Sequence, residues 1–462
     1  MIGFRRRAPS FDVADVQANI IDALAFRHAH SLVVRIDRPD AARRLIGDLL
    51  PIIASAALRH EKKAEVTANV ALSAGGLRRL GVDEETIVSF GDAFAQGMAA
   101  RAAVLGDRGP SDPSTWAPGF ASGEAHLLVW LHAKDEPLLS SATDAWRMRT
   151  TNDGLALVHE LRSQMYGQER EHFGFADGFS QPQIRGLAKR MPGQTRHQFR
   201  REPLAPGEFV LGYPDYFGAV AAAASRPIGR NASMLVWRQL HQDVYRFRSW
   251  IREVAGPDGD HEFVAAKLVG RWRDGAPLVL APNDLHQQHE SNDVLVRNHF
   301  SYADDSLGVR CPLGAHVRRA NPRDGLPFSA LAERHRLIRR GIPYGMPLQR
   351  YAPDDGLERG LLFVSFQSDI ERQFEFVQQQ WCNDGSRLYI GADRDPLIGA
   401  ARPGDRFVIQ GCPPWIASDM PAFVTTRAGE YFVAPGLRAL GEIAGVRHES
   451  LSRHARPNWL DR

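Results

Sequence analysis

The stretch SLVVRID at residues 31–37 is rich in β-branched side chains and is bounded by Pro39, which is typical of a β-strand. Residues 39–58 then space leucine and isoleucine as a helix does, with Pro51 expected to start or kink the helix. VTANVAL at residues 66–72 alternates as a second strand, and Ser73 follows it as a candidate helix cap. Because such strands and helices recur at irregular intervals, the sequence predicts an α+β fold with antiparallel sheets flanked by helices.

The same mixture extends through both halves of the chain. Helices are expected at residues 13–25, 242–254 and 370–381, strands at 125–133, 232–239 and 360–367, and a helix followed by a strand within 142–165. The chain has 462 residues, a length that suggests two or three domains or two fused halves, and we place two domains at residues 1–215 and 216–462.

Composition and charge exclude several classes of protein. Hydrophobic residues make up 44% and charged residues 24% of the chain, which is ordinary for a globular protein and argues against disorder. Lys and Arg number 57 and Asp and Glu 54, so the net charge of +3 gives no general attraction to nucleic acid or membranes. The three cysteines are too far apart to form a CxxC motif or a disulfide framework. Because no apolar stretch follows the short basic run at the start, we expect a cytoplasmic protein.

HFGFADGFSQPQI at residues 172–184 holds a candidate carboxylate for the active site. Asp177 stands between Gly174 and Gly178, with phenylalanines close by in the sequence. Apolar neighbours raise the pKa of a carboxylate unless a cation is also near. The alternative is a structural Asp-Gly turn, because Asp tolerates and glycine favours a positive φ.

CPLGAHVRRANPR at residues 311–323 holds a candidate metal ligand. His316 follows Gly314 and Ala315, whose small side chains let another group approach closely, and three arginines come after it. An imidazole can give one nitrogen to a metal while the other nitrogen needs a hydrogen-bond acceptor. The alternative is a core histidine whose ring bonds to the backbone.

Two further stretches carry weaker signals. HRLIRRGIPYG at residues 335–345 is dense in arginine, and its local pattern favours a solvated helix end. His286 and His289 have helical spacing beside Glu290 but lack the HExxH arrangement, so the sequence does not favour a metal site there. The chain also contains neither a GxSxG elbow nor a phosphate-binding glycine motif.

Together these motifs resemble those of the dye-decolourising peroxidases, haem enzymes of the dimeric α+β-barrel superfamily. The family's GxxDG motif is matched at residues 174–178, its histidine motif at 314–323 and its arginine segment at 336–345. The similarity extends to a DIQGNI-like segment at 15–20 and to segments at 235–247 and 268–278. The resemblance implies two ferredoxin-like domains with haem between them, the first carrying GxxDG and the second the histidine and arginine motifs. It also points to the larger intracellular subgroup.

The resemblance implies a set of residues on the metal side of the haem. His316 would be the axial ligand of haem b iron, and its second ring nitrogen would bond to a carboxylate that increases imidazolate character. Asp395 is our expected acceptor, with Asp393 as the alternative. Arg323, seven residues after His316, would pair with a haem propionate.

A second set would face the open side of the iron. The resemblance implies that Asp177 moves a proton and that Arg339 stabilises negative charge on the departing oxygen. Leu361 and Phe363, which alternate on one predicted strand, would form an apolar wall.

The activity implied is the reduction of hydrogen peroxide through an oxo-ferryl intermediate, with oxidation of dyes, phenols or other one-electron donors. Large donors would pass electrons either through surface tyrosines or tryptophans or at the propionate edge of the haem. By residue type alone the candidate relays are Tyr344, Tyr351, Trp272 and Trp381, and the alternative for each is a packing role. Two alternatives stay open. One is a haem-handling protein, chlorite-dismutase-like or iron-releasing, and the other is a haem-binding cargo protein with incidental peroxidase activity. No nucleic-acid or membrane partner is expected, and a homo-oligomer stays open.

Overall fold

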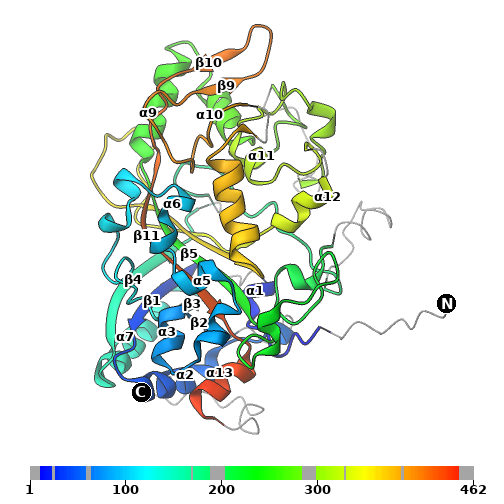
Figure 1. Ribbon diagram of the computed structural model, residues 1–462. Helices are drawn as coiled ribbons and strands as arrows, with labels where there is room; N and C mark the ends of the chain where they lie inside the picture. Colours follow the sequence, from blue (N-terminus) through cyan, green and yellow to red (C-terminus); the bar gives the residue numbers. More distant parts are fainter. Residues whose placement is uncertain are drawn as a thin grey trace, which may run out of the picture.

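Four strands and two helices form a ferredoxin-like unit in the first half of the chain (Figure 1). The computed structural model describes residues 11–22, 26–58, 64–167, 170–187, 203–283, 298–326, 329–386 and 390–446. The strands are β1 (His28–Arg35), β2 (Val66–Leu72), β3 (Leu127–Ala133) and β4 (Ala156–Gln164), antiparallel in the order β4-β1-β3-β2. Helix α2 (Pro39–Leu49) connects β1 to β2, and α7 (Glu136–Asn152) connects β3 to β4.

The second half repeats this strand order. Its long strands are β5 (Ser233–Gln242), β8 (Gly360–Gln367) and β11 (Val424–Ala434), and two short strands, β6 (Ile338–Arg339) and β7 (Ile342–Tyr344), both pair with β8. The order β11-β5-β8-β6 therefore matches the first unit when β6 and β7 together count as the second strand. Helices α9 (Val244–Ala255) and α10 (His261–Val269) follow β5, and two π-helical segments, Ile370–Glu375 and Val377–Cys382, follow β8.

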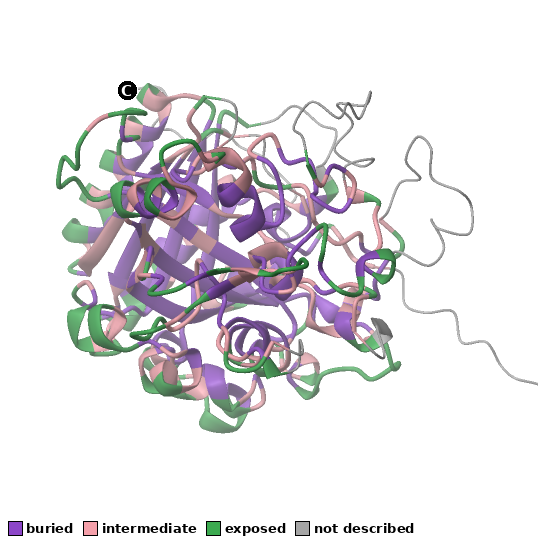
Figure 2. Ribbon diagram, turned by 90° about the horizontal axis from the view of Figure 1, so that it is seen from above, coloured by how far each residue is buried: buried purple, intermediate pink, exposed green. Residues whose placement is uncertain are grey.

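The two units share one nine-stranded sheet, because β2 pairs with β11 where Leu72 lies opposite Val433. At the far end of the sheet β4 lies beside β7, so the sheet curls into a barrel. The strands lie mostly in the buried interior, and the exposed residues lie on the outer sides of the surrounding helices and in the loops (Figure 2). Helix α13 (Leu437–Ala444) packs beside α2, which ties the C-terminal part of the described chain to the first unit.

The remaining elements are short. They are α1 (Ala18–Ile21), α3 (Ala74–Arg79), α4 (Glu84–Val88), α5 (Asp92–Gln96), α6 (Ala102–Leu105), α11 (His316–Ala320), α12 (Ser329–Ala332) and the paired strands β9 (Phe407–Ile409) and β10 (Trp415–Ala417). Within the described ranges, no helix has both the length and the apolar composition that crossing a membrane requires.

The predicted α+β fold is confirmed, but several predicted elements differ in length or type. Of the helix predicted at 13–25, only α1 forms among the described residues, because residues 13–17 form turns and a bridge; residues 23–25 lie outside the described ranges. The helix predicted at 39–58 ends at Leu49, and Pro51 lies in a short 3-10 turn, since proline cannot continue an α-helical hydrogen-bond ladder. Ser73 caps α3 as expected by accepting the N–H of Gly76. The boundary predicted between residues 215 and 216 stays a prediction.

Candidate functional site

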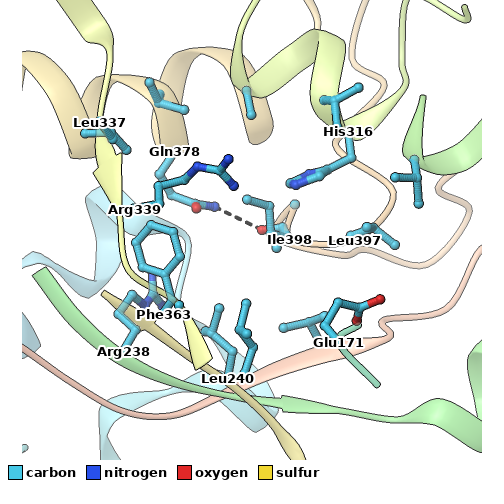
Figure 3. Close-up of a pocket in the computed structure, with 18 of the residues that line it drawn as sticks. Glu171, Arg238, Leu240, His316, Leu337, Arg339, Phe363, Gln378, Leu397 and Ile398 are labelled. Carbon is cyan, nitrogen blue, oxygen red and sulfur yellow. Dashed lines mark hydrogen bonds between the residues drawn. The ribbon is translucent and has the colours of Figure 1, made fainter. Parts of the chain in front are cut away.

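A cavity of about 400 Å³ lies against the second unit and brings the three sequence motifs together (Figure 3). Its walls come from the loop after β4, from strands β5 and β8, from helix α11 and from residues 394–402. In Figure 3 the side chains of His316 and Arg339 point toward one another across it. This volume is within the range of small-molecule and cofactor sites.

His316 is the first residue of α11, and a carboxylate holds its ring. Its Nδ1 atom lies 3.0 Å from Oδ2 and 3.2 Å from Oδ1 of Asp395. The Asp395 side chain is fully buried and also accepts the backbone N–H groups of Leu397 and Ile398. Asp393, the alternative acceptor, instead binds Arg406 at 2.9 Å. Because Asp395 engages Nδ1, Nε2 is the nitrogen of His316 that faces the cavity and can bind a metal.

The hydrogen bond and opposite charges of His316 and Asp395 shift the pKa values of both side chains. Burial alone would lower the pKa of His316, but the charge and hydrogen bond of Asp395 outweigh it and raise that pKa above its usual value. Burial would likewise raise the pKa of Asp395, but His316, Arg319 and the N–H of Ile398 hold it below the usual range. Asp395 is therefore a carboxylate that increases the basicity of the imidazole.

Asp177 and Arg339 lie together on the opposite side of the cavity. Asp177 follows β4, and its Oδ1 accepts the N–H of Gly178 at 2.6 Å and Nη1 of Arg339 at 3.3 Å. Gly178 has the positive φ of +91° that the alternative of an Asp-Gly turn required, but no turn is assigned at residues 177 and 178, and the Asp177 carboxylate lines the cavity. Of the Asp177 side-chain surface, 44% is accessible, so a ligand can reach it.

Arg339 keeps Asp177 ionised. Burial pushes the pKa of Asp177 upward, but the Arg339 guanidinium and the N–H of Gly178 outweigh that effect and leave the pKa below its usual value. The segment that carries Arg339 is not the helix end that its local pattern favoured, because residues 338–344 form β6 and β7 against β8. The sheet thereby places Arg339 beside a loop that is 162 residues away in the sequence.

Sequence reasoning missed Gln181, which joins these two segments. Its Nε2 donates to the carbonyl oxygen of Arg339 at 3.0 Å, and its Oε1 accepts the N–H of Arg339 at 3.0 Å. A side-chain amide can both donate and accept, so the pair fixes the backbone of Arg339 relative to the loop of Asp177. The position of Gln181 within FSQP, directly after the GxxDG motif, was the available signal.

Leu361 and Phe363 line the cavity from β8, while Leu362 and Val364 between and beside them are fully buried on the other face. Phe363 lies next to Arg339 in Figure 3. The alternation of the strand therefore directs two apolar side chains to the side of the cavity that holds Asp177 and Arg339.

Arg323 also lines the cavity, in a buried and cationic corner. Its guanidinium donates to the carbonyl oxygens of Asn298 and Phe300 and lies 3.9 Å from the centre of the Phe300 ring. Burial, together with the charges of Arg336 and Arg271, lowers its pKa to about 10. Within the described residues no carboxylate pairs with Arg323. Sequence reasoning missed Arg336 and Arg271, which line the same corner.

Other predicted candidates lie elsewhere. Tyr351 is 84% exposed, whereas Tyr344, Trp272 and Trp381 are buried. The stretch from His286 to Glu290 lies outside the described residues, and the described part of the chain contains no group of three His, Cys, Asp or Glu side chains placed to hold a metal.

Comparison with known proteins agrees with this geometry. Residues 15–165 match the family model "DyP dimeric alpha+beta barrel domain", and residues 284–388 match "Dyp-type peroxidase, C-terminal". A dye-decolorizing peroxidase of Mycena epipterygia is 30% identical over 95% of this chain and 88% of its own. The multifunctional dye peroxidase DyP2 of an Amycolatopsis strain is 32% identical over 74% of this chain and 80% of its own. A solved dye-decolorizing peroxidase in complex with 2,6-dimethoxyphenol is 27% identical and superimposes with a TM-score of 0.80, over 94% of this chain and 99% of that one.

Proposed function

Because the chain belongs to the dye-decolorizing peroxidase family, and is therefore a haem peroxidase that oxidises dyes and phenols, we propose that it binds haem b and uses hydrogen peroxide as its oxidant. The observation that carries this proposal is the hydrogen bond between His316 and Asp395. It leaves a basic imidazole nitrogen facing a cavity of cofactor size.

The residues around the cavity fit haem b. His316 would hold the iron through Nε2, with Asp395 fixing its ring orientation. Arg323, a half-buried cation without a carboxylate partner among the described residues, would pair with a propionate. When bound, haem supplies an iron centre that takes two oxidising equivalents from peroxide and passes them singly to donors.

On the other side of the iron, Asp177 would act first as a base and then as an acid. Its ionised carboxylate takes one proton from the incoming peroxide and returns it to the oxygen that departs as water. Arg339 stabilises the negative charge that develops on that oxygen. Overall, one peroxide and two donor hydrogens yield two waters and two donor radicals, so protons and electrons balance.

Leu361 and Phe363 would keep this side of the cavity dry and narrow. A dry site strengthens the interaction of Arg339 with the developing charge. It would also exclude large dyes, which must then be oxidised from the edge of the cavity or the protein surface. We also propose a cytoplasmic location, which the three free cysteines support.

The test is peroxide-dependent oxidation of 2,6-dimethoxyphenol by the haem-loaded protein, with the His316→Ala and Asp177→Asn variants measured at equal haem content. We expect turnover by the wild-type protein and a large loss in each variant. Equal turnover by all three would show that haem reacts without this site and would overturn the proposal.

A further inference from the structure

We define the rim of the cavity as the exposed part of its lining other than Asp177. Apart from Asp177, the exposed residues among those that line the cavity are Arg108, Pro110, Ala401, Arg402 and Ala422. They come from three segments, which follow α6, Asp395 and β10 along the chain. The segment of Ala401 and Arg402 continues directly from Leu397 and Ile398, which lie near His316 in Figure 3. The rim is therefore connected to the edge of the site that His316 occupies.

Asn383 holds two sides of this rim close together. Its Nδ2 donates to the carbonyl oxygen of Leu105 at 2.7 Å, and its Oδ1 accepts the N–H of Ala400 at 2.9 Å. Gly106 lies between them with a φ of +78°, and a Cβ there would stand 2.6 Å from Cβ of Ala400. Only glycine permits this approach without a shift of the neighbouring chain. The spacing between the loops that carry Arg108 and Arg402 is thus fixed by the fold.

Three guanidinium groups gather at the rim. Neither Arg108 nor Arg402 forms an ion pair within the described residues, and Arg394 lies buried behind them, where it donates to the carbonyl oxygen of Ala400. Burial lowers the pKa of Arg394, and the charges of Arg402 and Arg108 lower it further. Asp405 and Asp384 offset this repulsion only in part. Like charges that are compensated only in part are costly to hold together, and a bound anion would relieve that cost.

The surface beside these charges is apolar. The cavity lining here includes the exposed or half-buried residues Pro110, Ala400, Ala401, Ala422 and Val424, whereas Leu105, which also lines the cavity, is fully buried. Of the nearby carboxylates, Asp107 is buried against Arg238, and Asp405 accepts the backbone N–H of Arg402. A cationic edge on an apolar wall is complementary to a flat ring with a negative substituent.

We propose that the arginine rim, formed by Arg108, Arg394 and Arg402, docks aromatic electron donors that carry a carboxylate or sulfonate group. This inference rests on the proposed function and adds the charge class of its reducing substrates. The anionic group binds at the rim while the ring lies on the apolar wall, facing the edge of the cavity. Each docked donor gives one electron, and a phenolic donor also its hydroxyl proton, to the peroxidase reaction described above.

Binding tests the rim without any turnover. Haem-loaded protein, free of peroxide, is titrated by calorimetry with naphthalene-2-sulfonate and with the neutral naphthalene-2-sulfonamide. We expect the sulfonate to bind more tightly, and the double variant Arg108→Ala/Arg402→Ala to weaken it about fivefold, as two exposed ion pairs would. Arg108→Lys/Arg402→Lys keeps the charge and most of the affinity. Arg44→Ala/Arg79→Ala removes the same charge from exposed positions on α2 and α3 and serves as the control.

Equal affinity for the two ligands, or the same loss in the control variant, would overturn the proposal. A kinetic comparison separates this failure from failure of the proposed function. The donors are 3-(4-hydroxyphenyl)propionate and its amide, whose saturated linkers leave the phenol rings alike. We expect the ratio of KM for the carboxylate to KM for the amide to rise about fivefold in Arg108→Ala/Arg402→Ala. Oxidation of both donors with an unchanged ratio would reject the rim alone, whereas no peroxide-dependent oxidation of either would reject the peroxidase function.

Discussion

Nδ1 of His316 lies 3.0 Å from Oδ2 of Asp395, a side chain that is fully buried although its pKa is held below the usual range. A buried carboxylate stays ionised only where charges and hydrogen bonds compensate for the lost water. Here the compensation comes from His316, Arg319 and the backbone of Ile398. The pair therefore fixes one ring nitrogen and increases the basicity of the other, which is the atom that would bind the iron of haem in the proposed function.

Replacing Asp395 by Asn should raise the ferric/ferrous reduction potential of the haem-loaded protein. The neutral amide lacks the negative charge that would give His316 imidazolate character, so the ferric state of the haem is less stabilised. Spectroelectrochemical titration measures the change. Asp393→Asn is the matched control, because Asp393 binds Arg406 instead, and its potential should equal that of the wild type. The same potential in Asp395→Asn and the wild type would contradict the assigned role.

Arg339→Leu should slow the reaction with peroxide while haem stays bound. Loss of one preorganised charge at a developing anion costs on the order of 100- to 1,000-fold in rate. Stopped-flow absorbance of the Soret band after mixing with peroxide reports this step. Arg79→Leu is the control, since Arg79 is an exposed arginine on α3 that does not line the cavity. Comparable slowing in both variants would mean that Arg339 acts only through the fold.

The acid limb of the peroxide reaction should follow the pKa of Asp177. That pKa lies below its usual value of 3.8, so the carboxylate stays ionised through neutral pH and the rate should fall only in more acidic solution. In Arg339→Leu the effect of burial is less opposed, so the pKa rises and the acid limb moves to higher pH. Rates of the Soret change measured against pH in both proteins test this shift. A limb that moves to lower pH, or not at all, would contradict it.

Gln181→Leu should reduce the same rate, although Gln181 does not react. The substitution removes both hydrogen bonds to the backbone of Arg339, which then loses its fixed position beside Asp177. We expect about a tenfold loss, with a smaller loss in Gln181→Glu, which keeps the acceptor for the N–H of Arg339. If the rate falls as much in Gln181→Glu as in Gln181→Leu, or falls in neither variant, the hydrogen bonds of Gln181 have no part in positioning Arg339.

The local sequence was sufficient to predict several helices and strands and the α+β class of the fold. Strands β2 and β8 have the bounds that were predicted, because both are short runs of strand-forming residues with clear ends. It was not sufficient for β11, whose side chains are mixed and whose central place depends on pairing with both β5 and β2. The helix predicted at 370–381 exists, but its π-helical turns arise from packing that no local pattern encodes.

The site, too, was predictable from the sequence only in part. The motifs marked Asp177, His316 and Arg339, yet only the structure could choose between Asp393 and Asp395, which are two residues apart in an irregular segment. His316 and Asp395 are separated by 79 residues, and their contact depends on how that segment returns to α11. The arginine rim likewise depends on Asn383, which bonds Leu105 and Ala400 in the segments that carry Arg108 and Arg402, and spacing along the chain cannot predict these contacts.

Resonance Raman spectroscopy of the ferrous, haem-loaded protein tests the central claim most directly, because an iron–histidine stretching band reports the ligand itself. We predict that the wild-type protein shows this band, that His316→Gly lacks it and that added imidazole restores it at a different frequency. An unchanged band in His316→Gly would show that another side chain holds the iron and would contradict the account.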